Sequence, residues 1–308
     1  MEPLWSQQLR LGIVGAAPDA APMRRPYPSG AISVFGLEDE RRMRGWAFCN
    51  ELYRDVSLSE ALNNIAATGY TGVELDARCL VGRDMAELRD ECNDKGLSVV
   101  GLHWLLAGTH GLHLTHPARD VRRATLSHLR GLVAKCAELG GRVMTLGAGQ
   151  TRSMLGGVTR DEALGYAREI LGELGNELVA RGIYLGVEPL RPQECNLLNR
   201  VEIAAALVDR IGCPNIGLTL DAKAMDSEPR PREELIMEYA HYLVHVHVND
   251  PTGTGPGMGA TDLEPMLRAV KSAAYVGWIS VEAFDPSPDP DIVASKSLEY
   301  LRRTWKSA

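Results

Sequence analysis

Eight short apolar runs alternate with helical stretches from residue 46 onward, and this alternation limits the possible folds more than any other feature. The runs are rich in valine, isoleucine and leucine and have the length of ordinary strands. The predicted strands are WAFCN (46–50), GVEL (72–75), SVVGLHW (98–104), RVMTL (142–146), IYLGVE (183–188), IGLTLD (216–221), LVHVHV (243–248) and WISVE (278–282).

Helical patterns lie between these strands, for example over 57–69, 83–96, 160–182 and 261–274, and several begin at a capping residue and end at glycine. Strand–helix repeats form a parallel sheet, which is either closed or doubly wound. Eight repeats without a glycine-rich first turn favour closure. We therefore predict an α/β fold with a single (β/α)8 TIM barrel over residues 45–308. Residues 1–44 are predicted to be a poorly structured N-terminal extension.

Charge and composition exclude several classes of protein. The chain has 308 residues and a formal net charge of −7, so its charge predicts binding neither to nucleic acid nor to a membrane. No apolar run approaches the roughly 20 residues that cross a bilayer, and the N-terminus lacks the basic region of a signal peptide. The six cysteines form no CxxC motif, and reduced thiols in a cytoplasmic protein are expected.

Ionisable residues occur in the last four predicted strands. Side chains alternate between the two faces of a strand, so in the run 243–248 the valines face the helices while His245 and His247 face the interior. His247 is the nearer to the mouth at which barrel enzymes hold their catalytic groups. The same alternation directs three carboxylates inward at the ends of the other strands: Glu188, Asp221 and Glu282.

These four side chains are predicted to converge at one end of the barrel. Burying three carboxylates together without compensation is costly, so we expect a cation among them. Oxygen donors with one imidazole suit Mn²⁺ best, with Mg²⁺ or Co²⁺ as alternatives. The sequence therefore predicts one divalent metal ion with the ligands Glu188, Asp221, His247 and Glu282.

The segments around these residues resemble the sugar phosphate isomerase/epimerase family of xylose isomerase-like TIM barrels. They are VEPLRPQE, TLDAKAM, HVHVND and ISVEAFD, and the resemblance extends from about Gly45 to the C-terminus. The family includes ketose 3-epimerases, hydroxypyruvate isomerase and inosose dehydratase. The resemblance implies a metal-dependent isomerase or epimerase of a sugar or sugar phosphate, working by proton transfer next to a carbonyl through a metal-stabilised enediolate.

The resemblance also implies roles for the four residues. Glu188 and Glu282, on the fifth and eighth strands, would act as the catalytic acid and base on opposite faces of a substrate carbon. Asp221 and His247 would serve as ligands only. We further expect a small-molecule carbohydrate substrate and a homodimer or homotetramer.

Five other residues are candidates for substrate binding: Glu74, His103, Arg152, Glu194 and Lys223. Glu194 lies six residues after the first predicted ligand, where the ketose 3-epimerases carry a glutamate that contacts substrate. Glu74 and His103 face inward by strand alternation, and Glu74 could hold a hydroxyl or pair with a neighbour. Arg152 and Lys223 could bind an anion or a substrate oxygen.

The sequence departs from the ketose 3-epimerase pattern at two positions. Those enzymes carry a histidine three residues after the metal-binding aspartate and an arginine six residues after the metal-binding histidine, whereas this chain has Ala224 and Gly253. Both missing groups hold substrate oxygens in those enzymes, which argues against a simple ketohexose 3-epimerase. The loop 252–259 could bind phosphate through backbone N–H groups or act as a lid. Trp104 and Trp278 could line the pocket, but core packing is their expected role.

Three other functions would make different demands on the sequence. A metal-dependent lyase or dehydratase could act on a keto-inositol or a 3-keto sugar or glycoside with the same metal and base. An abasic-site DNA endonuclease needs a three-zinc cluster with more inward histidines, and it needs a surface that attracts phosphate, which the acidic composition does not predict. A catalytically inactive binding protein would not need to keep all four predicted ligands.

Overall fold

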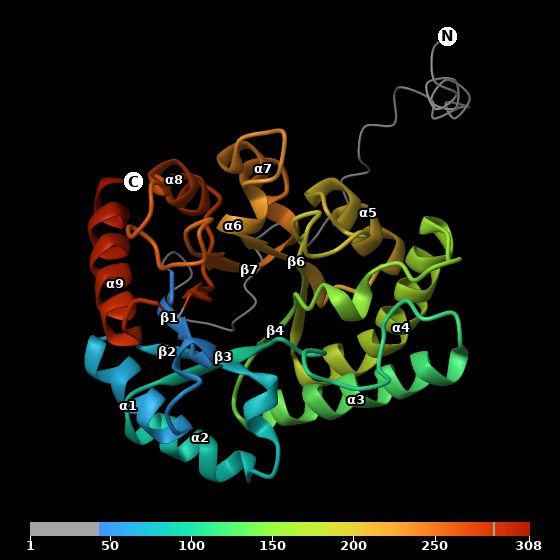
Figure 1. The fold of residues 1–308 in the computed structure, drawn as a ribbon, viewed down its shortest axis with the longest axis horizontal. Helices are drawn as coiled ribbons and strands as arrows, with labels where there is room; N and C mark the ends of the chain where they lie inside the picture. Colours follow the sequence, from blue (N-terminus) through green and yellow to red (C-terminus); the bar gives the residue numbers. More distant parts are fainter. Residues whose placement is uncertain (1–42, 286) are drawn as a thin grey trace. The chain divides into compact units, whose positions relative to one another are not determined.

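The computed structural model describes residues 43–285 and 287–308, which form a closed barrel of parallel strands with helices around it (Figure 1). Residues 1–42, nearly all of the predicted N-terminal extension, lie outside the described residues, so the domain boundary stays a prediction. The strands are β1 (Gly45–Cys49), β2 (Gly72–Asp76), β3 (Ser98–His103), β4 (Val143–Leu146), β5 (Tyr184–Val187), β6 (Ile216–Asp221), β7 (Leu243–Val248) and β8 (Trp278–Val281).

Each strand pairs with its neighbour in sequence, and β8 pairs with β1 to close the ring. All eight predicted strands are present, which confirms the single (β/α)8 barrel. The prediction for the third strand ran one residue too far, because Trp104 has a left-handed φ of 54° that ends the extended backbone at His103. Glu188 and Glu282 likewise lie just beyond β5 and β8.

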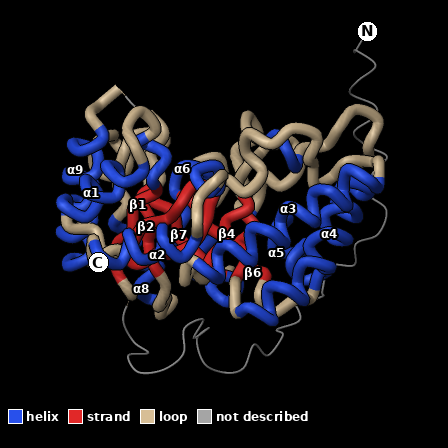
Figure 2. The backbone as a smooth tube through the Cα atoms, turned by 90° about the horizontal axis from the view of Figure 1, so that it is seen from below, coloured by secondary structure: helices blue, strands red, loops and turns tan. Residues whose placement is uncertain are grey.

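The helices pack outside the barrel, and Figure 2 shows the strands enclosed by them. Their bounds are α1 (Leu58–Thr68), α2 (Met85–Asp94), α3 (Arg119–Glu138), α4 (Arg160–Arg181), α5 (Val201–Ile211), α6 (Ala222–Met225), α7 (Arg232–Glu238), α8 (Glu264–Ser272) and α9 (Pro290–Ser307). Local signals set the ends of α4: Thr159 and Glu162 form a capping box, and Gly182 ends the helix with a φ of 62°.

Gly101 in β3 lies so close to the backbone of β4 that no side chain fits at this position. A Cβ atom there would overlap the carbonyl oxygen of Val143 on β4. Gly101→Ala is expected to lower the free energy of unfolding by about 1–3 kcal/mol, because the two strands must separate to admit the methyl group. Urea denaturation measures the change.

Gly131→Ala is the matched control. Gly131 is an exposed residue inside α3, and no side chain of the described residues lies within 4 Å of the point that an added methyl group would occupy. The same substitution there should raise the free energy of unfolding by roughly 0.5–1 kcal/mol, since alanine favours the helix. Equal effects at the two sites would show that β3 and β4 are not packed as described.

Among the described residues, no helix has the length and apolarity that crossing a bilayer requires. The six cysteines are all free, and none forms a disulfide.

Candidate metal centre

The structure brings the four predicted ligands together at the carboxyl ends of β5 to β8. One ligand atom from each of Glu188, Asp221, His247 and Glu282 lies within 4.8 Å of the others. All four residues are buried, with at most 4 % of their surface exposed. Gly147, after β4, makes room for this arrangement, because a side chain there would overlap the Glu188 carboxylate.

The three carboxylates of the predicted ligand set repel one another unless a cation lies between them. Burial and the charges of Glu282 and Asp221 raise the pKa of Glu188 well above its usual range. Burial and the charge of Glu282 raise the pKa of Asp221 to about 6. A divalent ion would remove both effects, since three carboxylate oxygens and one imidazole nitrogen are a suitable ligand set for it. The residues therefore fit the predicted ion.

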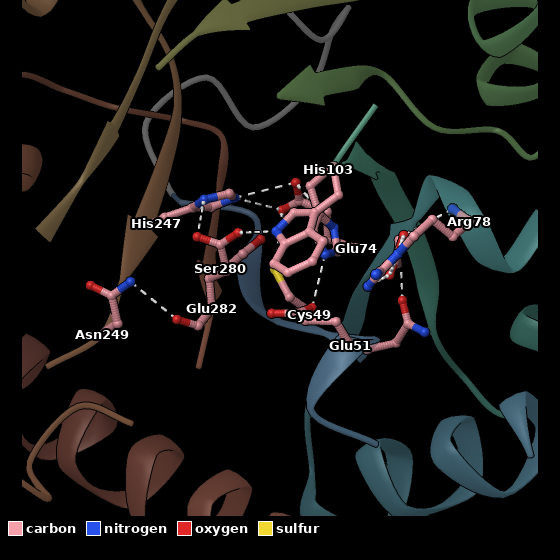
Figure 3. A network of polar contacts seen from close by, with 12 residues as sticks. Cys49, Glu51, Glu74, Arg78, His103, His247, Asn249, Ser280 and Glu282 are labelled. Atoms are coloured by element: carbon pink, nitrogen blue, oxygen red, sulfur yellow. Dashed lines mark hydrogen bonds and ion pairs between the residues drawn. The ribbon is translucent and has the colours of Figure 1, made fainter. Parts of the chain in front are cut away.

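His247 is oriented for such an ion by the carboxylate behind it. Its Nε2 lies 3.1 Å from Oε2 of Glu74, while its Nδ1 lies 3.2 Å from Oε2 of Glu282 and has no hydrogen-bond partner among the described residues (Figure 3). With an ion bound, Nε2–H would donate to Glu74 and the lone pair of Nδ1 would be free for the ion. Carboxylates fix the tautomer of metal-binding histidines in the same way.

Glu74 is the centre of a buried polar network beneath the four ligands. Besides His247 it accepts a hydrogen bond from His245 at 2.8 Å. Burial alone would raise the pKa of Glu74, but the charges and hydrogen bonds of His247 and His245 hold it well below its usual range. His103 pairs with Glu51, with 2.8 Å between Nε2 and Oε2. Glu74 therefore pairs with its neighbours, one of the two roles that the sequence left open.

Asn249 connects two of the ligands, and sequence reasoning missed it. Its Nδ2 donates to Oδ2 of Asp221 at 2.7 Å. It also donates to the carbonyl oxygen of Glu282 at 3.1 Å (Figure 3). Its Oδ1 accepts from the backbone N–H of Lys223 at 2.8 Å. The only signal in the sequence was a buried polar residue directly after a strand of valines, which strand alternation cannot interpret.

A cavity of about 950 Å³ opens over three of the four ligands, while His247 is fully buried. Its lining includes Glu188, Asp221, Glu282, Trp104, Phe284, Glu194 and Lys223. Lys223 and Glu194 form an ion pair at 2.8 Å, and the Lys223 ammonium lies 4.1 Å from the centre of the Phe284 ring. Both residues thus line the cavity, and their role in substrate binding stays a prediction.

The other three candidates for substrate binding are not among the described residues that line the cavity. Glu74 and His103 have no exposed surface and lie in the polar network beneath it. Arg152 is also fully buried, and its Nη2 donates to the carbonyl oxygen of Glu188. The structure therefore gives Arg152 a role in supporting the end of β5. Strand alternation predicted inward orientation correctly, but it does not give the depth of a side chain in the barrel.

The loop 252–259 is ordered by an acidic residue. Asp250 accepts hydrogen bonds from the backbone N–H groups of Thr252 at 3.0 Å and Thr261 at 3.3 Å. It also accepts one from the Thr252 hydroxyl at 2.7 Å. The carboxylate thus occupies backbone donors that a phosphate would use, and its charge would repel one. This arrangement disfavours the phosphate-binding role for these donors.

The two tryptophans have different environments. Trp278 packs with Ala47 and Val100 in the core, as expected. Trp104 lines the cavity and its Nε1 lies 3.3 Å from Oε1 of Glu282. The expectation that Trp104 serves core packing was therefore wrong, because its positive φ turns the chain at the end of β3 and brings the indole to the site.

A closed (β/α)8 barrel with four potential metal ligands at the carboxyl ends of its strands is typical of metal-dependent barrel enzymes. Comparison with known proteins identifies the family. A sequence model of the xylose isomerase-like TIM barrel family matches residues 62–304. The chain belongs to this family, which confirms the resemblance.

Among curated relatives, a probable ketose 3-epimerase from Synechocystis sp. is 22 % identical over 259 residues, covering 78 % of this chain and 88 % of that protein. A putative hydroxypyruvate isomerase from Streptomyces coelicolor is 27 % identical over 272 residues, covering 81 % and 92 %. Among solved structures, a D-psicose 3-epimerase in the presence of D-fructose gives a TM-score of 0.76 at 18 % identity, covering 85 % of this chain and 99 % of that one. A 3-keto-D-glucoside 4-epimerase from E. coli also gives 0.76, at 20 % identity, covering 85 % and 100 %. The 18 % and 20 % identities to these two solved structures support the fold alone.

Proposed function

We propose that the protein is a divalent-metal-dependent isomerase or epimerase that moves a proton next to the carbonyl of a sugar or sugar phosphate. The chain is an enzyme of the isomerase and epimerase class, in keeping with its relatives. The observation that carries the finer proposal is the placement of two glutamates, Glu188 after β5 and Glu282 after β8, on either side of Asp221 and His247 and in one cavity.

Glu188, Asp221, His247 and Glu282 would hold the ion, and Mn²⁺ fits this oxygen-rich set best. When bound, the ion supplies Lewis-acid stabilisation of negative charge that develops on substrate oxygen. The protein's side chains do the rest. One glutamate takes the proton from the carbon next to the carbonyl, which breaks the C–H bond and leaves its electron pair on the substrate.

The second glutamate gives a proton back and restores a C–H bond. Return to the opposite face of the same carbon inverts that centre, which is epimerisation. Return to the neighbouring carbon, with the hydroxyl proton transferred between the two oxygens, is aldose–ketose isomerisation. The Lys223–Glu194 pair lies in the cavity wall, where it could bind substrate hydroxyls, and Asn249 keeps Asp221 and the Glu282 backbone in place.

A metal-dependent lyase is the second candidate, and the position of Gly253 favours it. Gly253 lines the cavity without a side chain, whereas Ala224 is buried and offers its backbone N–H to Asp221 at 2.7 Å. The cavity wall at Gly253 therefore leaves room for a ring-closed keto-inositol or 3-keto glycoside. Loss of the same proton would then expel a β-hydroxyl or an alkoxide, and the enone product is detected by its ultraviolet absorbance.

Deuterium incorporation tests the proposal. Keto sugars, their phosphates, keto-inositols and 3-keto glycosides are incubated with the protein and Mn²⁺ in D₂O. Label is expected at the carbon next to the carbonyl of at least one of them, and the product distinguishes epimer, isomer and enone. Absence of label from all of these substrates, with the metal bound, would refute proton transfer as the function.

A further inference from the structure

We propose that Trp104 is a positioning residue whose indole N–H fixes the orientation of the Glu282 carboxylate. The inference rests on the proposed function for what Glu282 does. The contact itself is direct, since Nε1 of Trp104 lies 3.3 Å from Oε1 of Glu282. The two residues are 178 positions apart in sequence and directly follow β3 and β8, which β1 and β2 separate in the ring.

The backbone of Trp104 is held in a conformation that a bulky residue adopts only under constraint. Its φ is 54°, and of the described residues other than glycine only Ala274 also has a positive φ. Such a conformation is unfavourable for an L-residue, because it brings Cβ close to a carbonyl oxygen. It persists where the surrounding contacts fix it, and such sites cluster where function needs a set geometry.

A cation and a second aromatic ring both contact the indole. The guanidinium of Arg78 lies 4.4 Å from the centre of the Trp104 ring, and Arg78 is itself ion-paired with Asp76. Phe284 stacks with Trp104 at 6.1 Å between centroids and 24° between planes. Lys223 lies over the Phe284 ring at 4.1 Å. The contacts with Arg78 and Phe284 restrict rotation of the indole, so its N–H is a fixed donor.

The contact separates the roles of the two Glu282 oxygens. Oε1 accepts from the indole, while Oε2 faces Nδ1 of His247 at 3.2 Å. Indole nitrogen only donates, and the terminal torsion of a glutamate is otherwise broad. Without this donor the carboxylate could turn while its backbone, held by Asn249, stayed in place. The expected loss is therefore in the chemistry and in metal binding, with little effect on the fold.

Trp104→Phe keeps an aromatic ring for the stack and removes the N–H group. At saturating Mn²⁺ we expect kcat for proton exchange to fall about 10–100-fold, while KM stays within about threefold. Titration with Mn²⁺ in the absence of substrate is expected to show an approximately tenfold higher Kd. Trp46→Phe is the matched control, because Trp46 is a buried tryptophan that packs edge-on against Trp305, and it should change neither quantity.

The outcomes separate this inference from the proposed function. A Trp104→Phe protein within about twofold of wild type in both kcat and Mn²⁺ affinity would overturn the positioning role, since such a contact normally contributes at least tenfold. If the wild type exchanges no proton with any sugar, the proposed function fails, yet the Mn²⁺ titration still tests Trp104. Benzothienylalanine at position 104 keeps the two-ring shape without the N–H, and it serves if the phenylalanine variant does not fold.

Discussion

Glu188→Gln should lower the rate of substrate interconversion by roughly 10³–10⁴-fold, the upper range of what a positioned general acid or base contributes. The amide keeps the size of the side chain and one oxygen that can face an ion, but it can neither take nor return a proton. The measurement is product formation at saturating Mn²⁺, with metal content determined for each variant. Glu173→Gln is the matched control, because Glu173 is an exposed residue on α4 paired with Arg123, and it should leave the rate unchanged.

Deuterium incorporation, measured with each epimer supplied separately, shows which glutamate acts on which face of the substrate carbon. If Glu188 and Glu282 act on opposite faces of one carbon, Glu188→Gln should still label the epimer whose proton faces Glu282. Glu282→Gln should label only the other epimer. Equal loss with both epimers while the ion stays bound would contradict the assignment of two opposed bases. Retention of interconversion in Glu188→Gln would make Glu188 a ligand only.

The barrel and the four clustered ionisable residues were predictable because side chains alternate between the two faces of a strand. The bounds of β6 and β7 were predicted without error, and alternation within the last four strands placed four ionisable groups on one side. Parallel strands share one carboxyl edge, so four such groups at strand ends must meet. The sequence therefore carried both the closure of the sheet and the convergence of Glu188, Asp221, His247 and Glu282.

Other features of the site could not be predicted, because they depend on strand register, on the height of a side chain in the barrel and on backbone turns at strand ends. The pairing of β2 with β3 shifts by one residue next to Glu74, and that of β6 with β7 shifts next to Thr219. Relative heights in the barrel therefore do not follow from counting, and Glu74 lies below the cavity although it faces inward. Trp104 and Asn249 lie where the strand pattern ends, and their side chains are directed by local backbone angles that no periodicity encodes.

Removal of the metal is expected to abolish exchange and to lower the thermal midpoint. An ion present at about 100 times its Kd stabilises the folded protein by roughly 2.7 kcal/mol. For a barrel of this size each kcal/mol corresponds to about 2–4 °C, so Tm should fall by about 5–10 °C after chelation. Differential scanning calorimetry measures the shift, and addition of Mn²⁺ should reverse it.

Asp221→Asn provides the control that separates metal binding from general stabilisation. It removes one of three crowded carboxylate charges, which burial and the neighbouring Glu282 already disfavour. It also removes one of the two acceptor oxygens that Ala224 N–H and Asn249 Nδ2 use, so its metal-free form should melt close to the metal-free wild type. The same variant should lose most of the Mn²⁺-dependent shift, because one ligand is weakened. A wild-type Tm that does not respond to millimolar Mn²⁺, together with a protein that elemental analysis finds free of divalent metal, would contradict the metal centre. The four side chains would then be a buried ion network that needs protons in place of an ion.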